Sequence, residues 1–112
     1  MFTAVSTWSF PRPGEEQAFE EHYWNVHVPL AQRIPNTAEL VLTRTAYALP
    51  GEQPAFYRAV VMSFPDQQAF EAATRTPEWD ELRSDSAAII ERFGVRLLTG
   101  MGEPETVEIT WR

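Results

Sequence analysis

The spacing of apolar residues switches between a period of two and a helical period several times along this 112-residue chain, and this succession limits the possible folds most strongly. Residues 2–10 alternate as a strand does, and residues 15–30 carry apolar side chains at helical spacing. Residues 39–48 and 56–64 are rich in Val, Leu, Thr, Phe and Tyr and are joined by a polar turn at 50–54. They are therefore predicted to form a β-hairpin with a long loop.

The first helical segment is interrupted by a proline. Four apolar side chains recur there at intervals of four, three and four residues and predict a core-facing stripe: Phe19, Tyr23, Val26 and Leu30. Pro29 cannot donate a helical hydrogen bond and restricts the residue before it. We therefore expect this helix to end, kink or restart between His27 and Leu30.

Capping residues mark the helices of the second half. Asp66 is a candidate N-cap, and Thr76 followed by Pro77 predicts a second start. The face of that second helix comprises Trp79, Leu82, Ser86, Ile89 or Ile90, and Phe93. Gly94 should end it, and two short strands are predicted at 95–99 and 106–111.

The resulting order, β-α-β-β-α-β with a short extra strand, is typical of a ferredoxin-like α+β subunit in which two helices cover one face of an antiparallel sheet. The length suits one domain, residues 1–112. Apolar strand residues are too numerous for a monomer to cover: Trp8, Phe10, Leu40, Leu42, Val60, Met62 and Leu98. We therefore expect a homodimer with sheets packed face to face.

Composition excludes several classes of function. Sixteen acidic residues against nine basic ones give a net charge of −7, which disfavours nucleic acid and anionic membrane surfaces as partners. The chain has no cysteine for a disulfide, thiolate metal centre or nucleophile, and two histidines argue against a histidine-rich metal site. All basic residues are arginine, so no lysine can form a Schiff base. Without a signal peptide or a membrane-spanning apolar run, we expect a cytoplasmic protein.

The segment 21–30 concentrates groups that could carry chemistry, since it contains both histidines, a tyrosine and a tryptophan ahead of a proline. On a helical projection His27 lies about 40° from Tyr23, at the edge of the apolar stripe. An imidazole there suits proton transfer on a small molecule near neutral pH. The simpler interpretation is that His27 only caps carbonyls freed by Pro29. His22 projects to the opposite edge and is expected at the surface or a rim.

Aromatic and arginine side chains supply candidate substrate-binding residues. Trp24, Trp79 and Trp8 could contact a substrate, although such side chains more often belong to a core. Arg58, and with less support Arg44, could bind a substrate oxyanion if it points toward the uncovered sheet face.

The charged residues of the second helical segment are interpreted as solvent-facing. Asp85 and Glu78 could pair with Arg83 or Arg75, which requires no function. The sequence contains no phosphate loop, nucleotide-binding fingerprint, serine elbow or paired-carboxylate motif.

The stretch 19–30, F-E-E-H-Y-W-N-V-H-V-P-L, followed by Ile34-Pro35, resembles the signature of the EthD family in the dimeric α+β barrel superfamily. Phe70, Thr76-Pro77-Glu78 and Asp85 resemble that family's second-helix pattern. The resemblance implies a subunit that dimerises through its sheet and encloses a cavity between helices and sheet.

The resemblance also implies a role in breaking down or tailoring small organic molecules. Relatives are linked to ether degradation, and the wider superfamily includes cofactor-free monooxygenases, polyketide cyclases, lactone isomerases and dehalogenation-related proteins. Carried over onto matching positions, His27 is the polar residue of the cavity, with Tyr23 and Trp24 beside it.

Two function hypotheses follow, and a third has less support. The first is a cofactor-independent enzyme, without a metal, that acts on an apolar cyclic or aromatic molecule. In it His27 is the general acid or base, Tyr23 orients the substrate, and Arg58 could stabilise an enolate or phenolate. The second is a non-catalytic protein of a catabolic pathway that binds a hydrophobic small molecule. The third, haem binding through His27, lacks the supporting residues of relatives that handle haem.

Overall fold

A four-stranded antiparallel sheet forms one layer of the computed structural model, which describes residues 1–111. The strands are β1 (Phe2–Trp8), β2 (Glu39–Arg44), β3 (Arg58–Phe64) and β4 (Leu97–Gly102). Their order across the sheet is β2-β3-β1-β4, so the first strand of the chain lies inside the sheet between β3 and β4.

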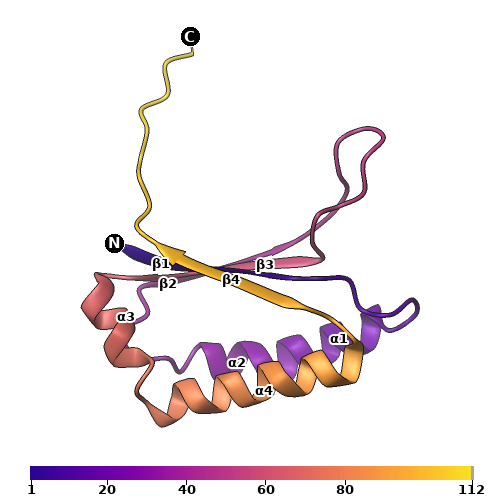
Figure 1. Ribbon diagram of the computed structural model, residues 1–112, viewed down its shortest axis with the longest axis horizontal. Coiled ribbons are helices and arrows are strands. Elements are labelled where there is room, and N and C mark those ends of the chain that lie inside the picture. The colour runs from indigo at the N-terminus through magenta and orange to yellow at the C-terminus, as the bar shows by residue number, and fades with distance from the viewer. Residues whose placement is uncertain (112) are drawn as a thin grey trace.

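The helices form the second layer and cover one face of the sheet (Figure 1). They are α1 (Glu16–His22), the π-helical turn η1 (Tyr23–His27), α2 (Val28–Ala31), α3 (Gln67–Ala73) and α4 (Pro77–Phe93). Segments α1, η1 and α2 follow one another without a break, and η1 and α2 contact α4. The predicted ferredoxin-like α+β class is thus confirmed. None of the helices within residues 1–111 is long and apolar enough to cross a membrane.

The predicted interruption near Pro29 takes the form of a change in helix type. The backbone N–H of Val28 donates to the carbonyl of Tyr23, five residues earlier, which is the π-helical spacing. Pro29 follows directly and lacks the N–H that an α-helical hydrogen bond to Asn25 would need. The helix therefore continues past His27 with one wide turn.

The wide turn corrects the predicted core stripe. Each residue of a π turn advances by a smaller angle than in an α-helix, so the residues after Tyr23 face different directions from those expected. His27 and Val28 are buried, whereas Val26, predicted in the stripe, is 40% exposed. Phe19 of α1 and Ala31 of α2 are also buried and complete the core-facing side of the continuous helical segment α1–η1–α2.

Local capping signals are confirmed. The carboxylate of Asp66 accepts a hydrogen bond of 2.8 Å from the Ala69 N–H at the start of α3. The Thr76 hydroxyl accepts one of 3.3 Å from the Trp79 N–H ahead of α4. Gly94 ends α4 with φ of 67°, a left-handed conformation that favours glycine.

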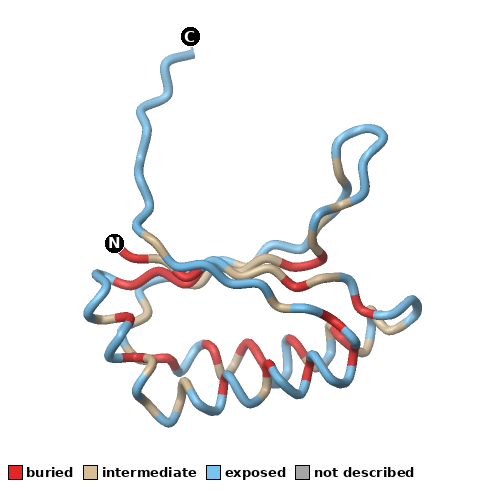
Figure 2. Tube along the Cα trace, viewed as in Figure 1, coloured by how far each residue is buried: buried red, intermediate tan, exposed pale blue. Residues whose placement is uncertain are grey.

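One predicted strand is absent from residues 1–111, and both strands of the predicted hairpin have different bounds. Residues 106–111, predicted as a strand, form none and belong to an exposed tail that runs away from the sheet (Figures 1 and 2). A strand needs a neighbour for its backbone hydrogen bonds, and this segment finds none among residues 1–111. The hairpin strands are shorter than predicted, because residues 45–57 form a long loop that projects on the side opposite the helices (Figure 1).

The buried residues lie between the helices and the sheet, and the other sheet face is bare (Figure 2). Side chains alternate between faces, so Trp8 and Met62 point toward the helices and are buried, whereas Leu98 points away and is 61% exposed. Val5 and Val41 share that open face, each 45% exposed. The uncovered face is therefore less apolar than the sequence led us to expect.

Candidate functional site

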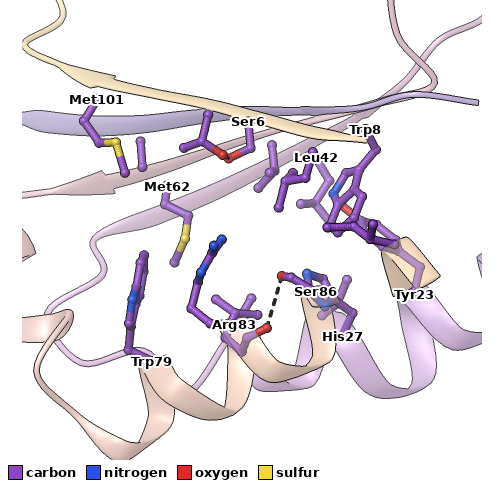
Figure 3. A pocket seen from close by; sticks show the side chains of 18 residues that line it. Ser6, Trp8, Tyr23, His27, Leu42, Met62, Trp79, Arg83, Ser86 and Met101 are labelled. Atoms are coloured by element: carbon purple, nitrogen blue, oxygen red, sulfur yellow. Dashed lines mark hydrogen bonds between the residues drawn. The ribbon is translucent and has the colours of Figure 1, made fainter. Parts of the chain in front are cut away.

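A cavity of about 400 Å³ lies between the helical layer and the sheet (Figure 3). Its walls are largely apolar, with contributions from β1, β2, β3, β4 and the two long helical segments. The side chains that bring polar atoms to it are Ser6, Tyr23, His27, Arg83, Ser86 and Thr99. Such a mainly apolar cavity with a few convergent polar groups is typical of a site for a small organic molecule.

His27 is the imidazole of this cavity. It ends η1, is 8% exposed, and places Nδ1 2.9 Å from Oδ2 of Asp85 on α4. A carboxylate can only accept a hydrogen bond, so Nδ1 carries the proton and the lone pair of Nε2 is left available as a base. The ring is held edge-on to Trp8, with centroids 5.5 Å apart, and stacks on Tyr23 at 5.6 Å.

Asp85 joins both histidines of the chain. His22 Nε2 lies 2.9 Å from Oδ1 and 3.1 Å from Oδ2 of the same carboxylate. The π turn explains this arrangement, since residues five apart point in different directions on an α-helix but align across a π turn. Asp85 is therefore not the solvent-facing partner of Arg83 or Arg75 that the sequence predicted, and only 12% of its side chain is exposed. His22 is half-buried and does not line the cavity.

Burial decides the charge of His27. It lowers the pKa of the imidazole below its ordinary value of 6.5, while the hydrogen bond and charge of Asp85 act in the opposite direction. The net lowering favours the neutral base at neutral pH.

Tyr23 lies against His27 and also lines the cavity. Burial raises the pKa of its phenol to about 12, and the nearby Arg58 guanidinium opposes that shift. The hydroxyl therefore keeps its proton over the physiological range and is able to donate a hydrogen bond to a ligand.

Arg58 and Trp24 lie outside the cavity. Arg58 is 5% exposed on the helix-covered face of the sheet, and its guanidinium pairs with both carboxylate oxygens of Glu20. That guanidinium lies over the rings of Tyr23, at 5.0 Å, and Trp24, at 5.4 Å, and Trp24 is 49% exposed. Arg44 also reaches Glu20, at 3.6 Å. Neither arginine faces the uncovered side of the sheet, which was the condition set for binding an oxyanion there.

Two of the tryptophans predicted to contact a substrate do line the cavity. Trp8 comes from β1 and Trp79 from the first turn of α4 (Figure 3). Arg83 and Ser86 line it as well, although sequence reasoning gave neither a role in a site. Arg83 and Ser86 follow Trp79 by four and seven residues, a spacing that places all three on one side of a helix, and this spacing could have identified both as neighbours of Trp79 in a site.

A model of the EthD domain matches residues 12–92, which run from the turn before α1 to the last turn of α4. The chain belongs to the EthD family. An uncharacterized 11.0 kDa protein from the thcB-thcC intergenic region of Rhodococcus erythropolis is 30% identical over 78 residues, which are 70% of this chain and 75% of that protein. The matched range contains the two histidines and Asp85.

Solved structures share the fold of this EthD-family chain. An ethyl tert-butyl ether D (EthD) family protein from Bacillus halodurans has a TM-score of 0.68 and 28% identity, over 94% of this chain and all of that one. A dimeric ferredoxin-like protein from Thermobifida fusca has a TM-score of 0.60 and 15% identity, over 88% of each chain. SnoaB, a cofactor-independent oxygenase from Streptomyces nogalater, has a TM-score of 0.63 and 15% identity, over 95% of this chain and 94% of that one.

Proposed function

We propose that this EthD-family protein is a cofactor-independent enzyme that removes a proton from an apolar, cyclic or aromatic molecule held in the cavity. One observation carries the proposal: the cavity is lined by a buried imidazole whose Nδ1 is bonded to a carboxylate, which leaves Nε2 free to act as a base. The apolar walls favour a substrate with a hydrophobic body.

The geometry supports a proton transfer in which each partner has a defined role. Nε2 of His27 accepts a proton from a C–H or O–H of the substrate, and the electron pair moves onto an adjacent oxygen to give an enolate or phenolate. The carboxylate of Asp85 stabilises the imidazolium that forms. The Tyr23 hydroxyl donates a hydrogen bond to the developing oxyanion. Returning the proton at another carbon completes an isomerisation. If the enolate carbon instead attacks a carbonyl carbon of the same molecule, a ring forms and the proton passes from His27 to the resulting alkoxide. Reaction of the carbanion with O₂ would begin an oxygenation.

The wider fold supports the cofactor-independent part of the proposal. SnoaB, which shares the fold at 15% identity, is a cofactor-independent oxygenase. A protein of this fold can thus activate a substrate with its own side chains, as His27 and Asp85 are proposed to do here.

We further propose that the working form is a homodimer joined through the bare sheet faces. Val5, Val41 and Leu98 expose apolar surface on that face. The related ferredoxin-like protein of Thermobifida fusca is dimeric.

The alternative function is a protein of a catabolic pathway that holds a hydrophobic molecule in the same cavity without changing it. The large apolar share of the walls favours binding, and binding alone would need no base. Native mass spectrometry after incubation with a candidate ligand separates the two functions. A ligand recovered unchanged favours the binding protein, and a converted one favours the enzyme.

Hydrogen exchange into a model ketone tests the proposal directly. 2-Tetralone is bicyclic and has acidic C–H groups beside its carbonyl, so its exchange in D₂O, followed by NMR, reports proton abstraction. We expect the wild-type protein to accelerate exchange and the His27→Gln variant to lose that acceleration while it keeps the fold. Equal rates for both proteins, or no acceleration by the wild type, would contradict a catalytic base at His27.

A further inference from the structure

Arg83 is the one side chain with a permanent charge among the residues that line the cavity within the described chain. It lies four residues after Trp79 and three before Ser86, so α4 presents all three on one side. In Figure 3 the guanidinium of Arg83 rises from α4 into the space beneath the sheet, between Trp79 and Ser86. The charge is therefore directed at the place where a ligand would lie.

No carboxylate within residues 1–111 neutralises this guanidinium. Arg83 takes part in none of the ion pairs or side-chain hydrogen bonds of that region, whereas Arg44 and Arg58 both reach Glu20. Asp80, one turn earlier on α4, also lies beyond ion-pair distance of it. The chain has 16 acidic residues, yet none lines the cavity. Arg83 is exposed, so an anionic ligand would have to displace water and salt ions from its guanidinium.

The rest of the cavity strengthens an interaction with such a charge. Its walls are mostly apolar, and attraction between opposite charges grows as water is displaced from around them. An arginine fork also binds a carboxylate with two parallel hydrogen bonds, which fixes orientation as well as position. The net charge of −7 disfavours anions over the molecule as a whole, and Arg83 is the arginine through which the cavity can attract one.

We propose that the cavity takes an amphipathic organic anion, an apolar ring system that bears a carboxylate or a comparably acidic oxygen group, and that Arg83 binds the anionic group. This inference rests on the proposed function and narrows its substrate class from apolar molecules to apolar acids.

The position of Arg83 agrees with the proposed chemistry. Asp85, which holds His27, is two residues further along α4, and the anchoring cation of Arg83 and the base of His27 line the same cavity from α4 and η1. A ligand held by its anionic group at Arg83 would extend beneath the sheet with its rings near His27 and Trp8, both of which line the same space (Figure 3). Arg83 would thus select and orient the ligand, and His27 would act on it.

A matched pair of fluorescent probes tests this assignment. 8-Anilinonaphthalene-1-sulfonate and N-phenyl-1-naphthylamine share an aromatic framework, but only the first carries an anionic group. Binding of each is measured by fluorescence titration with the wild type, Arg83→Gln and Arg75→Gln. Arg75 is exposed between α3 and α4 and does not line the cavity, so its variant makes the same change in net charge elsewhere.

We expect Arg83→Gln to weaken binding of the sulfonate about tenfold and to leave the neutral probe within about twofold. Arg75→Gln should leave the binding of both probes unchanged, and added salt should weaken sulfonate binding by the wild type and by Arg75→Gln but not by Arg83→Gln. Three results would overturn the inference: unchanged sulfonate binding by Arg83→Gln, equal loss of both probes, or no sulfonate binding by the wild type.

The two proposals fail separately. His27→Gln should lose hydrogen exchange into 2-tetralone, which carries no charge, but keep salt-dependent binding of the sulfonate, because that dependence comes from Arg83. If exchange persists in His27→Gln but Arg83→Gln loses the sulfonate, the base assignment is wrong and the anion site stands. If His27→Gln loses exchange but Arg83→Gln binds the sulfonate as the wild type does, the anion site is wrong and the base assignment stands.

Discussion

The Nδ1 atom of His27 lies 2.9 Å from Oδ2 of Asp85, although the two residues are 58 positions apart in the chain. This contact crosses from η1 to α4 and gives the imidazole both an orientation and a defined tautomer. It also distinguishes His27 from a histidine that merely caps helix carbonyls, since its second nitrogen is left for the cavity that it lines.

Asp85→Asn should reduce hydrogen exchange into 2-tetralone by about a hundredfold or more, because the imidazolium loses its counter-charge and the amide, which can donate as well as accept, no longer fixes the proton on Nδ1. Asp80→Asn is the matched control, since Asp80 is exposed on the same helix. NMR exchange rates and circular dichroism of both variants check the expectation. Similar rates for the two variants would show that Asp85 does not support the base.

The lowered pKa of His27 predicts a loss of stability on acidification. Burial, the main cause, disfavours the charged imidazole in the folded state, so the unfolded chain binds a proton first as the pH falls below about 6.5. The stability that depends on His27 is present above that pH and is lost as the pH falls through the lower folded value. Urea unfolding near pH 7.5 and near pH 5.5 should show a larger decrease for the wild type than for His27→Gln. An equal decrease contradicts the assignment.

Glu20→Gln should lower the free energy of unfolding by about 2 kcal/mol, since it leaves the buried Arg58 without its counter-charge. Burial alone would raise the pKa of Glu20, but hydrogen bonds from Arg58 and Tyr57 lower it overall, so this acid is charged at neutral pH. Urea denaturation measures the loss. Glu21→Gln, on the exposed side of α1, should change stability by less than about 0.5 kcal/mol, and similar losses for the two variants would argue against a stabilising pair.

Leu98→Glu should convert the proposed dimer into a monomer, because Leu98 is 61% exposed on the bare face of the sheet. Light scattering coupled to size-exclusion chromatography should give about twice 12.8 kDa for the wild type and 12.8 kDa for the variant. Val26→Glu, a similar change on the helical layer, should stay dimeric. A monomeric wild type, or a dimeric Leu98→Glu, would rule out this interface.

Features that depend on neighbouring residues could be predicted from the sequence, and those that depend on distant ones could not. The caps at Asp66 and Thr76 and the end of α4 at Gly94 are local, and all three are confirmed. The π turn was missed because a proline break is compatible with a stop, a kink or a wide turn, and only packing against α4 selects among them. That error placed His22 and His27 on opposite edges and hid their shared partner, Asp85.

Tyr23→Phe should slow hydrogen exchange into 2-tetralone by about tenfold or more, because the oxyanion loses a hydrogen-bond donor while the ring still stacks on His27. Tyr57→Phe is a close control: burial raises the pKa of both phenols to about 12, but the Tyr57 hydroxyl donates to Glu20 at 2.9 Å and does not line the cavity. We expect Tyr57→Phe to lower stability by about 1 kcal/mol and to leave the exchange rate unchanged. Since Tyr23 stays protonated until about pH 12, the ratio of wild-type to Tyr23→Phe rates should be constant between about pH 7 and 9. If the two variants have equal rates, Tyr23 serves only to pack against His27.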